Sequence, residues 1–275
     1  MSDAVLTLND GKRIPRLGFG VWRLENDEAP AIVGAAFAAG YRLIDTAAMY
    51  GNEAGIGRAV AASGLAREEI FVATKVWNDR HGYDETLRAC EDSLARLGLD
   101  HVDLYLVHWP VPQRGAYVDT WRALMRLRED GRARSIGVCN FTVEHLKRVI
   151  DATGSTPSVN QVELHPRFQQ SGLRAFHEEA GIVTEAWAPL GRGGLLDDPV
   201  IRAIAEKHGR TPAQVVLRWH LDLGTVAIPK SANPARIREN REVSGFTLDD
   251  EDRARIKALD DPAGRMGPDP ETFGA

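Results

Sequence analysis

Short and almost continuous apolar runs recur along this chain, and helix-like stretches separate them. Such runs are typical of parallel strands that are covered on both faces, because a strand with one wet face alternates apolar and polar residues. Parallel strands joined by helices place the fold in the α/β class. The eight runs are Leu17–Trp22, Tyr41–Asp45, Ile70–Lys75, Val102–His108, Ser135–Asn140, Ser158–Glu163, Val183–Ala188 and Thr225–Ser231.

Helix boundary signals fall between these runs. Thr142, Thr211 and Asn233 are typical N-cap residues, and Asp27-Glu28 marks a further predicted helix start. A proline follows both Thr211 and Asn233, at the first helical position. Glycines stand just after helical stretches, where a left-handed cap is required: Gly40, Gly98, Gly131 and Gly181. Strands and helices are therefore expected to alternate.

Eight strand–helix units predict a (β/α)8 TIM barrel, in the α/β class. The alternative is an open doubly wound sheet, which usually carries G-x-G-x-x-G after its first strand, but Gly18-Phe-Gly20 lacks the third glycine. Asn9-Asp10-Gly11, within Leu6–Ile14, predicts an N-terminal β-hairpin that would close the barrel floor. The segment Pro262–Ala275 is expected to form a short C-terminal loop over the active site.

Composition narrows the function and the setting. The 275 residues are 43% hydrophobic and 27% charged without an internal linker, so we expect a single domain over residues 1–275. The net charge of -5 argues against a nucleic-acid partner. Cys90 and Cys139 are too few for a disulfide framework and lack metal-ligand spacing, which predicts no metal site and a cytoplasmic location. A membrane span would need ~18 consecutive apolar residues, and none occurs.

Four polar residues lie at or just after the ends of successive runs. Asp45, Lys75 and His108 end the second, third and fourth runs, and Tyr50 follows Asp45 in a short loop. The carboxyl ends of parallel barrel strands meet at one rim, so these groups are expected to converge there. Each residue taken alone has a simpler explanation, such as a helix cap, a packing residue or a solvated charge. Only their shared placement favours a site.

The residue types suit delivery of a proton to an oxygen that becomes negative. An ammonium ~4 Å from a phenol, at an effective dielectric of ~20, favours the phenolate by ~4 kcal/mol. We therefore expect Lys75 to lower the pKa of Tyr50 toward neutrality, by roughly three units. Asp45 would hold Lys75 in place, and a neutral His108 would hydrogen-bond the substrate oxygen.

Several segments resemble the aldo-keto reductases, and the similarity runs from about Leu6 to the C-terminus. Gly267–Phe273 and Trp187 look most like the prokaryotic 2,5-diketo-D-gluconate reductase branch. The resemblance implies a catalytic tetrad in which Tyr50 is the general acid, Lys75 and Asp45 tune it, and His108 orients the carbonyl. The matching segments include Asp45-Thr-Ala-Ala-Met-Tyr50-Gly-Asn-Glu, Thr74-Lys75-Val-Trp, Leu104-Tyr-Leu-Val-His108-Trp-Pro, Gly137-Val-Cys-Asn140-Phe, Asn160–Pro166, Ala188–Gly191 and Ile228–Ser231.

No side chain supplies a hydride, and the resemblance implies NADPH as the donor, with NADH less favoured. Lys230 and Ser231 end the last run, and Asn233 and Arg236 begin the next helix, where a phosphate could bind. A capped helix with solvated charges is the alternative. The resemblance implies that Lys230, Ser231 and Arg236 bind the adenosine 2′-phosphate. It also implies that Glu239 and Asn240 contact the adenine. Asn233 stands where some relatives have a basic residue, which would weaken the preference for NADPH.

The nicotinamide end is also implied by resemblance. Asn140 and Gln161 would bind the carboxamide, and Trp187 would stack on the ring. Cys139 stands where most relatives have serine, and a thiol is a weaker donor. The resemblance adds Gly20, Pro189, Leu190 and Gly191 to the cofactor groove.

Three tryptophans follow the first, third and fourth runs. Trp22, Trp77 and Trp109 could line an apolar substrate pocket with His108, although packing under loops is an equal alternative for Trp77. The predicted function is reduction of small aldehydes or ketones by a monomer, with sugar-derived diketones or methylglyoxal-like dicarbonyls as possible substrates. The alternatives are a nucleotide-sensing regulatory module and an isomerase or aldolase on the same barrel.

Overall fold

A closed ring of parallel strands forms the centre of the molecule. The computed structural model describes residues 5–274. The strands pair in chain order from β3 to β10, each parallel to the next. Each overlaps one of the predicted apolar runs. Their bounds are β3 Phe19–Gly20, β4 Leu43–Asp45, β5 Phe71–Val76, β6 Val102–Val107, β7 Ala133–Cys139, β8 Val159–Glu163, β9 Val183–Trp187 and β10 Val226–Ala227.

The first and last strands close the ring. Leu17 and Ala227 form a parallel bridge, and Gly18 N donates to Ala227 O at 2.9 Å. Gly20 N donates to Pro229 O at 3.1 Å, and a Cβ on Gly20 would lie only 2.9 Å from Ile228 O. The predicted TIM barrel is therefore confirmed. A doubly wound sheet would have reversed its strand order at a switch point.

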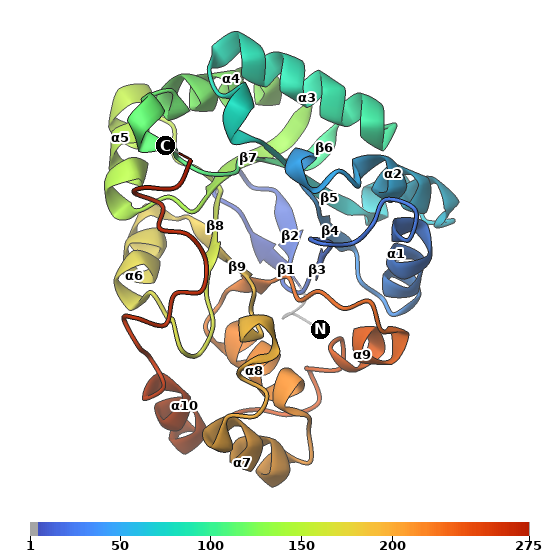
Figure 1. Cartoon of the computed structure of the whole chain (residues 1–275), viewed down its shortest axis with the longest axis vertical. Coiled ribbons are helices and arrows are strands. Elements are labelled where there is room, and N and C mark those ends of the chain that lie inside the picture. Colours follow the sequence, from blue (N-terminus) through green and yellow to red (C-terminus); the bar gives the residue numbers. More distant parts are fainter. Residues whose placement is uncertain (1–4, 275) are drawn as a thin grey trace.

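Helices surround the strands (Figure 1). Three predicted caps are present, because Thr142, Thr211 and Asn233 accept hydrogen bonds from backbone amides of the following turn. Glu28 precedes α1 as predicted but makes no capping bond with its side chain. The helices are α1 Ala29–Ala38, α2 Glu53–Ala62, α3 Tyr83–Leu97, α4 Tyr117–Glu129, α5 Val143–Thr153, α6 Ser171–Ala180, α7 Pro199–His208, α8 Pro212–Asp222, α9 Pro234–Glu239 and α10 Asp250–Lys257.

A two-stranded hairpin closes the amino-terminal end of the barrel, as predicted. β1 (Val5–Thr7) pairs antiparallel with β2 (Arg13–Pro15), and in Figure 1 both lie within the outline of the ring. Leu8 and Ile14 are buried against interior strand residues, among them Leu43 and Phe71. The barrel therefore has an apolar floor, and its polar residues can gather only at the opposite end.

The C-terminal segment crosses the other end of the barrel. After α10 it passes α6 and ends near α5 (Figure 1). The Glu163 carboxylate accepts hydrogen bonds from Met266 N at 2.6 Å and from Gly267 N at 2.8 Å. Phe273 then packs on Trp109, with 4.5 Å between ring centroids. The predicted C-terminal loop is thus tied to the carboxyl end of β8.

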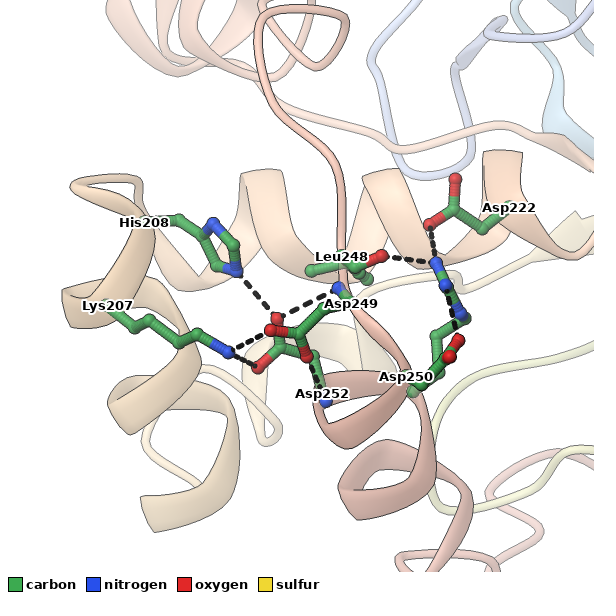
Figure 2. A network of polar contacts seen from close by, with 8 residues as sticks. Lys207, His208, Asp222, Leu248, Asp249, Asp250 and Asp252 are labelled. Carbon is green, nitrogen blue, oxygen red and sulfur yellow. Dashed lines mark hydrogen bonds and ion pairs between the residues drawn. The ribbon is translucent and has the colours of Figure 1, made fainter.

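A partly exposed ionic network joins α10 to α7 (Figure 2), and both helices lie outside the ring of strands (Figure 1). Lys207 Nζ contacts Asp249 Oδ2 at 2.6 Å and Asp252 Oδ1 at 2.9 Å. His208 Nε2 lies 2.6 Å from Asp252 Oδ2. We refer to these four residues as the α7–α10 network. Among residues 5–274, no helix has the length and apolar character needed to cross a membrane.

Candidate active site

Lys75 and Asp45 form a fully buried ion pair at the ends of adjacent strands. Lys75 Nζ donates to Asp45 Oδ1 at 2.8 Å, to Asp45 Oδ2 at 2.7 Å and to Thr46 O at 2.8 Å. The exposed fractions of the two side chains are 0% and 3%. Burial opposes the ammonium charge, but the Asp45 carboxylate outweighs it and raises the pKa of Lys75 above its usual value. Lys75 therefore carries a permanent positive charge.

Tyr50 lies against this ion pair in a short 3-10 turn, Ala48–Tyr50. Lys75 Nζ is 5.2 Å from the centroid of the Tyr50 ring. Burial raises the pKa of Tyr50 to about 12, and the charge of Lys75 offsets only part of that increase. The expectation that Lys75 brings this pKa toward neutrality is therefore wrong, because desolvation of the phenolate and the nearby Asp45 charge outweigh the ammonium. At neutral pH Tyr50 keeps its proton.

His108 directly follows β6 and faces Tyr50. The two ring centroids are 5.7 Å apart, and the Trp77 ring lies 5.0 Å from His108 on another side. Burial, assisted by the charge of Lys75, lowers the pKa of His108 well below its usual value. His108 is therefore neutral, as expected, and its imidazole can donate one hydrogen bond.

Two amide side chains next to these residues fit the expected carboxamide contact. Asn140, in the left-handed region at φ 60°, donates from Nδ2 to His108 O at 3.0 Å and accepts from Trp187 Nε1 at 2.8 Å. Gln161 Nε2 donates to Asp45 Oδ1 at 2.8 Å and to Glu185 Oε2 at 3.1 Å. Both N–H groups of Gln161 are thereby used, which leaves its carbonyl oxygen to accept from a carboxamide. Trp187 is half-buried, and the C-terminal segment lies close to its ring, since a Cβ on Gly267 would be 2.5 Å from it.

Cys139 lies inside the barrel, at the end of β7. Its side chain is fully buried among interior apolar residues of the barrel, including Leu106 and Val159. Burial raises the pKa of its thiol well above the usual value. The residue fits the alternative of a small buried packing group.

The predicted binding site for the adenosine 2′-phosphate contains two exposed basic side chains and the capped N-terminus of α9. Lys230 and Arg236 are exposed, and neither forms an ion pair within residues 5–274. The amides of Ala235 and Arg236 donate to Asn233 Oδ1, at 2.9 and 3.3 Å. Ser231 Oγ accepts from Asn233 N at 3.1 Å. The first amides of α9 thus serve its own cap, so Lys230 and Arg236 are the groups that fit a phosphate.

The other expected cofactor residues lie around these two ends. Asn240 is buried and Glu239 half-buried at the end of α9. Pro189 O accepts from His220 Nε2 at 3.2 Å in the turn after β9. Leu190 and Gly191, also predicted to contact the cofactor, lie in the same turn. Gly20 lies where the first and last strands close the barrel.

Two of the three tryptophans join an aromatic cluster at the barrel mouth. Phe273 lies 4.5 Å from Trp109 and 6.2 Å from Trp77, measured between ring centroids. Trp22, by contrast, is 38% exposed, and the Arg23 and Arg192 guanidinium groups lie 4.2 and 5.4 Å from its ring centroid. Trp77 and Trp109 therefore share one aromatic cluster with Phe273.

Three residues of this region were missed by sequence reasoning. Glu185 lies two positions before Trp187 on β9, so both point to the same side of the strand, yet Glu185 is fully buried. A charged residue within a buried strand was the available signal. Glu163, likewise buried within β8, and Phe273 gave weaker signals, because their role depends on where the C-terminal segment folds.

Comparison with known proteins agrees with this geometry. The model of the aldo/keto reductase family matches residues 16–261. An aldo-keto reductase of Mycobacterium sp. (strain JLS) is 54% identical over 273 residues, which cover 99% of each chain. Methylglyoxal reductase DkgA of Salmonella typhimurium is 49% identical over 272 residues, 98% of each chain. A crystal structure of a Gox0644 mutant in complex with NADPH superposes with a TM-score of 0.94 at 52% identity, covering 97% of both chains. The resemblance seen in the motifs is thus confirmed, and the chain belongs to the aldo/keto reductase family.

Proposed function

We propose that this protein reduces the carbonyl group of small aldehydes or ketones, with NADPH as hydride donor and Tyr50 as proton donor. The observation that carries the proposal is the buried Lys75–Asp45 pair beside a protonated Tyr50 and a neutral His108. Family membership and the NADPH-bound relative support the same reaction. The relative named methylglyoxal reductase points to small dicarbonyls as substrates, with sugar-derived diketones as a second group.

When bound, NADPH supplies the hydride that reduces the carbonyl carbon. The carbonyl oxygen of Gln161 accepts from the carboxamide, and stacking on Trp187 contributes about 0.5–1.5 kcal/mol beyond burial of area. Lys230 and Arg236 bind the adenosine 2′-phosphate by charge, and Arg236 can also make paired hydrogen bonds to it. NADH lacks that phosphate, so it is the less favoured donor.

Tyr50 completes the reaction by giving its proton to the oxygen on which negative charge develops. The Lys75 ammonium then stabilises the resulting phenolate by roughly 3 kcal/mol, for a separation of ~5 Å and an effective dielectric of ~20. Neutral His108 donates a hydrogen bond to the same oxygen and aims the carbonyl. Asp45 does not touch the substrate in this scheme; it keeps Lys75 charged and in place.

The proposal extends to the substrate pocket, the oligomeric state and the cellular compartment. Trp77 and Trp109 both pack on Phe273, and Trp77 also lies against His108, so apolar ring surface is available beside the proposed site for a short substrate. We also propose that the protein acts as a monomer in the cytoplasm. Both cysteines are free and buried, which suits a reducing compartment.

Tyr50→Phe tests the proton donor. The rate of NADPH oxidation with methylglyoxal at pH 7 is expected to fall by at least 10²-fold, the usual contribution of a general acid. NADPH binding, followed by its fluorescence, is expected to persist. The matched control is Tyr83→Phe, because Tyr83 is 41% exposed on α3.

Each possible result distinguishes the proposed reductase from one alternative assignment. A wild-type rate in Tyr50→Phe with intact NADPH binding means that Tyr50 is not the acid. Tight NADPH binding by the wild-type protein without turnover of any carbonyl favours a nucleotide-sensing module. No fluorescence change on mixing with NADPH favours an isomerase or aldolase on this barrel.

A further inference from the structure

A second carboxyl group lies inside the barrel beside the Lys75–Asp45 pair. Glu185, on β9, is fully buried. Its Oε2 accepts from Gln161 Nε2 at 3.1 Å, and its Oε1 has no hydrogen-bond partner within the described residues. No cation there forms an ion pair with it. A buried carboxylate without a paired cation is costly, so the neutral acid is the favoured form.

Gln161 links this acid to the ion pair. One amide nitrogen donates to both Glu185 Oε2 and Asp45 Oδ1, and Asp45 in turn holds Lys75 Nζ at 2.7 and 2.8 Å. The chain of contacts therefore runs from Glu185 through Gln161 and Asp45 to Lys75. A negative charge on Glu185 therefore alters the electrostatic surroundings of Asp45 and Lys75.

We propose that Glu185 is a positioning residue that is protonated in the active enzyme and that inhibits the site when it loses its proton. This inference rests on the proposed function. With Glu185 neutral, Asp45 is the sole buried counter-ion of Lys75. With Glu185 ionised, a second negative charge makes the phenolate of Tyr50 less favourable, so Tyr50 becomes a weaker acid. The ionised carboxylate also accepts more strongly from its own N–H of Gln161, the side chain that holds Asp45.

The charged groups around Glu185 place this change at mildly alkaline pH. Burial, together with the Asp45 charge, raises the pKa of Glu185 to about 8, against the opposing effects of Gln161 and Lys75. The other titratable groups that face it are Asp45, Lys75 and Cys139. The pKa values of Lys75 and Cys139 are raised above their usual values, and that of Tyr50 is about 12. Glu185 is therefore the group of this cluster that titrates near pH 8.

The pH dependence of kcat tests the proposal. One unit above a pKa of about 8, only roughly one-tenth of Glu185 keeps its proton, so kcat for methylglyoxal and NADPH is expected to fall about tenfold from pH 7 to pH 9. In Glu185→Gln, which stays uncharged and can still accept from Gln161, the same two values are expected to agree within about twofold. The same tenfold fall in Glu185→Gln overturns the proposal.

Glu53→Gln is the matched control. Glu53 is equally buried, but its carboxylate accepts from Thr74 Oγ1 at 2.6 Å and from Arg96 Nε at 2.7 Å, away from Gln161. This variant is expected to keep the tenfold fall. Loss of the fall in Glu53→Gln as well would show that any buried carboxyl change has this effect, and would also overturn the proposal.

Infrared spectroscopy of the protein without substrate gives a readout that does not need activity. Difference spectra between pH 7 and pH 9 are expected to show loss of a protonated carboxyl C=O band in the wild type and no such loss in Glu185→Gln. A wild-type protein without that band overturns the proposal, even if the variant does not fold. If the band titrates but no carbonyl is reduced at any pH, the proposed function fails and the protonation of Glu185 stands.

Discussion

The barrel mouth and the α7–α10 network contain the same kind of ion pair in opposite surroundings. Lys75 Nζ and Asp45 Oδ2 are 2.7 Å apart, and Lys207 Nζ and Asp249 Oδ2 are 2.6 Å apart. The exposed fractions of the side chains are 0% and 3% in the first pair, and 40% and 54% in the second. Distance therefore does not distinguish the pairs, and burial does.

The difference explains why only one of these networks can support chemistry. Water screens an exposed pair and replaces a lost partner, so such a pair contributes ~0–1 kcal/mol. A buried pair has no such replacement, and removing one partner leaves an uncompensated charge in a medium of low dielectric. The same property lets Lys75 act on Tyr50 across about 5 Å, because little solvent lies between them.

Lys75→Met should give the largest effect, because it removes the cation of the buried pair. The free energy of unfolding in urea is expected to fall by about 3–5 kcal/mol, since Asp45 is left buried and unpaired. The double variant with Asp45→Asn is expected to recover part of that loss. A loss in Lys75→Met that the double variant only deepens would show that packing, rather than charge, is responsible.

Glu163→Gln tests a buried carboxylate whose partners are two backbone amides and His165, rather than a lysine or an arginine. An amide offers one acceptor oxygen where Glu163 uses two for Met266 N and Gly267 N, so one bond is lost, at a cost of about 1–3 kcal/mol. Because Phe273 is then less well held on Trp109, KM for the carbonyl is expected to rise more than kcat falls. Glu271→Gln, on the exposed part of the same segment, is the control and should leave KM unchanged.

Acidic pH should weaken the same attachment. Burial opposes ionisation of Glu163, but hydrogen bonds from His165, Met266 and Gly267 outweigh it and lower its pKa. A lowered folded-state pKa means that the stabilisation is present above the unfolded value of about 4.3 and is lost as pH falls below it. Urea unfolding of the wild type and Glu163→Gln at pH 7 and pH 3.5 should show the two stabilities converging at the lower pH. A difference that stays constant would contradict the assignment.

Lys207→Met should give the smallest effect, although the substitution is the same as at Lys75. Lys207 is exposed, and His208 still contacts the buried Asp252 after the change. The urea midpoint is therefore expected to shift far less than in Lys75→Met. The remaining difference should shrink further in high salt, which screens exposed charges but not the buried pair. Equal shifts at the two lysines would contradict the role assigned to burial.

The order and placement of the strands could be predicted because they depend on local pattern. Apolar runs mark buried parallel strands, and a polar residue at the end of such a run reaches the rim whatever the details of packing. Asp45, Lys75 and His108 were located in this way, and they meet as expected.

The features that the sequence did not predict depend on a balance of opposing effects, or on contacts between residues distant in sequence. The pKa of Tyr50 rises because burial and Asp45 together outweigh Lys75, and no sequence pattern reports how deeply a loop residue is covered. Gln161 and Glu185 are register partners on the neighbouring strands β8 and β9, and Gln161 reaches Asp45 only because the distant strand β4 points inward at the same level of the barrel. Phe273 reaches Trp109 only because the last segment folds back over the mouth.

The hairpin at the barrel floor has a consequence for how protons move. Leu8 and Ile14 seal the amino-terminal end, so any exchange between Glu185 and bulk water has to pass through the end at which the substrate enters. A nicotinamide ring seated on Trp187 would obstruct that single route. Equilibration of the buried acid with solvent should therefore be fast in the free protein and slow while cofactor is bound, so that each turnover proceeds with the protonation state present when the cofactor arrived.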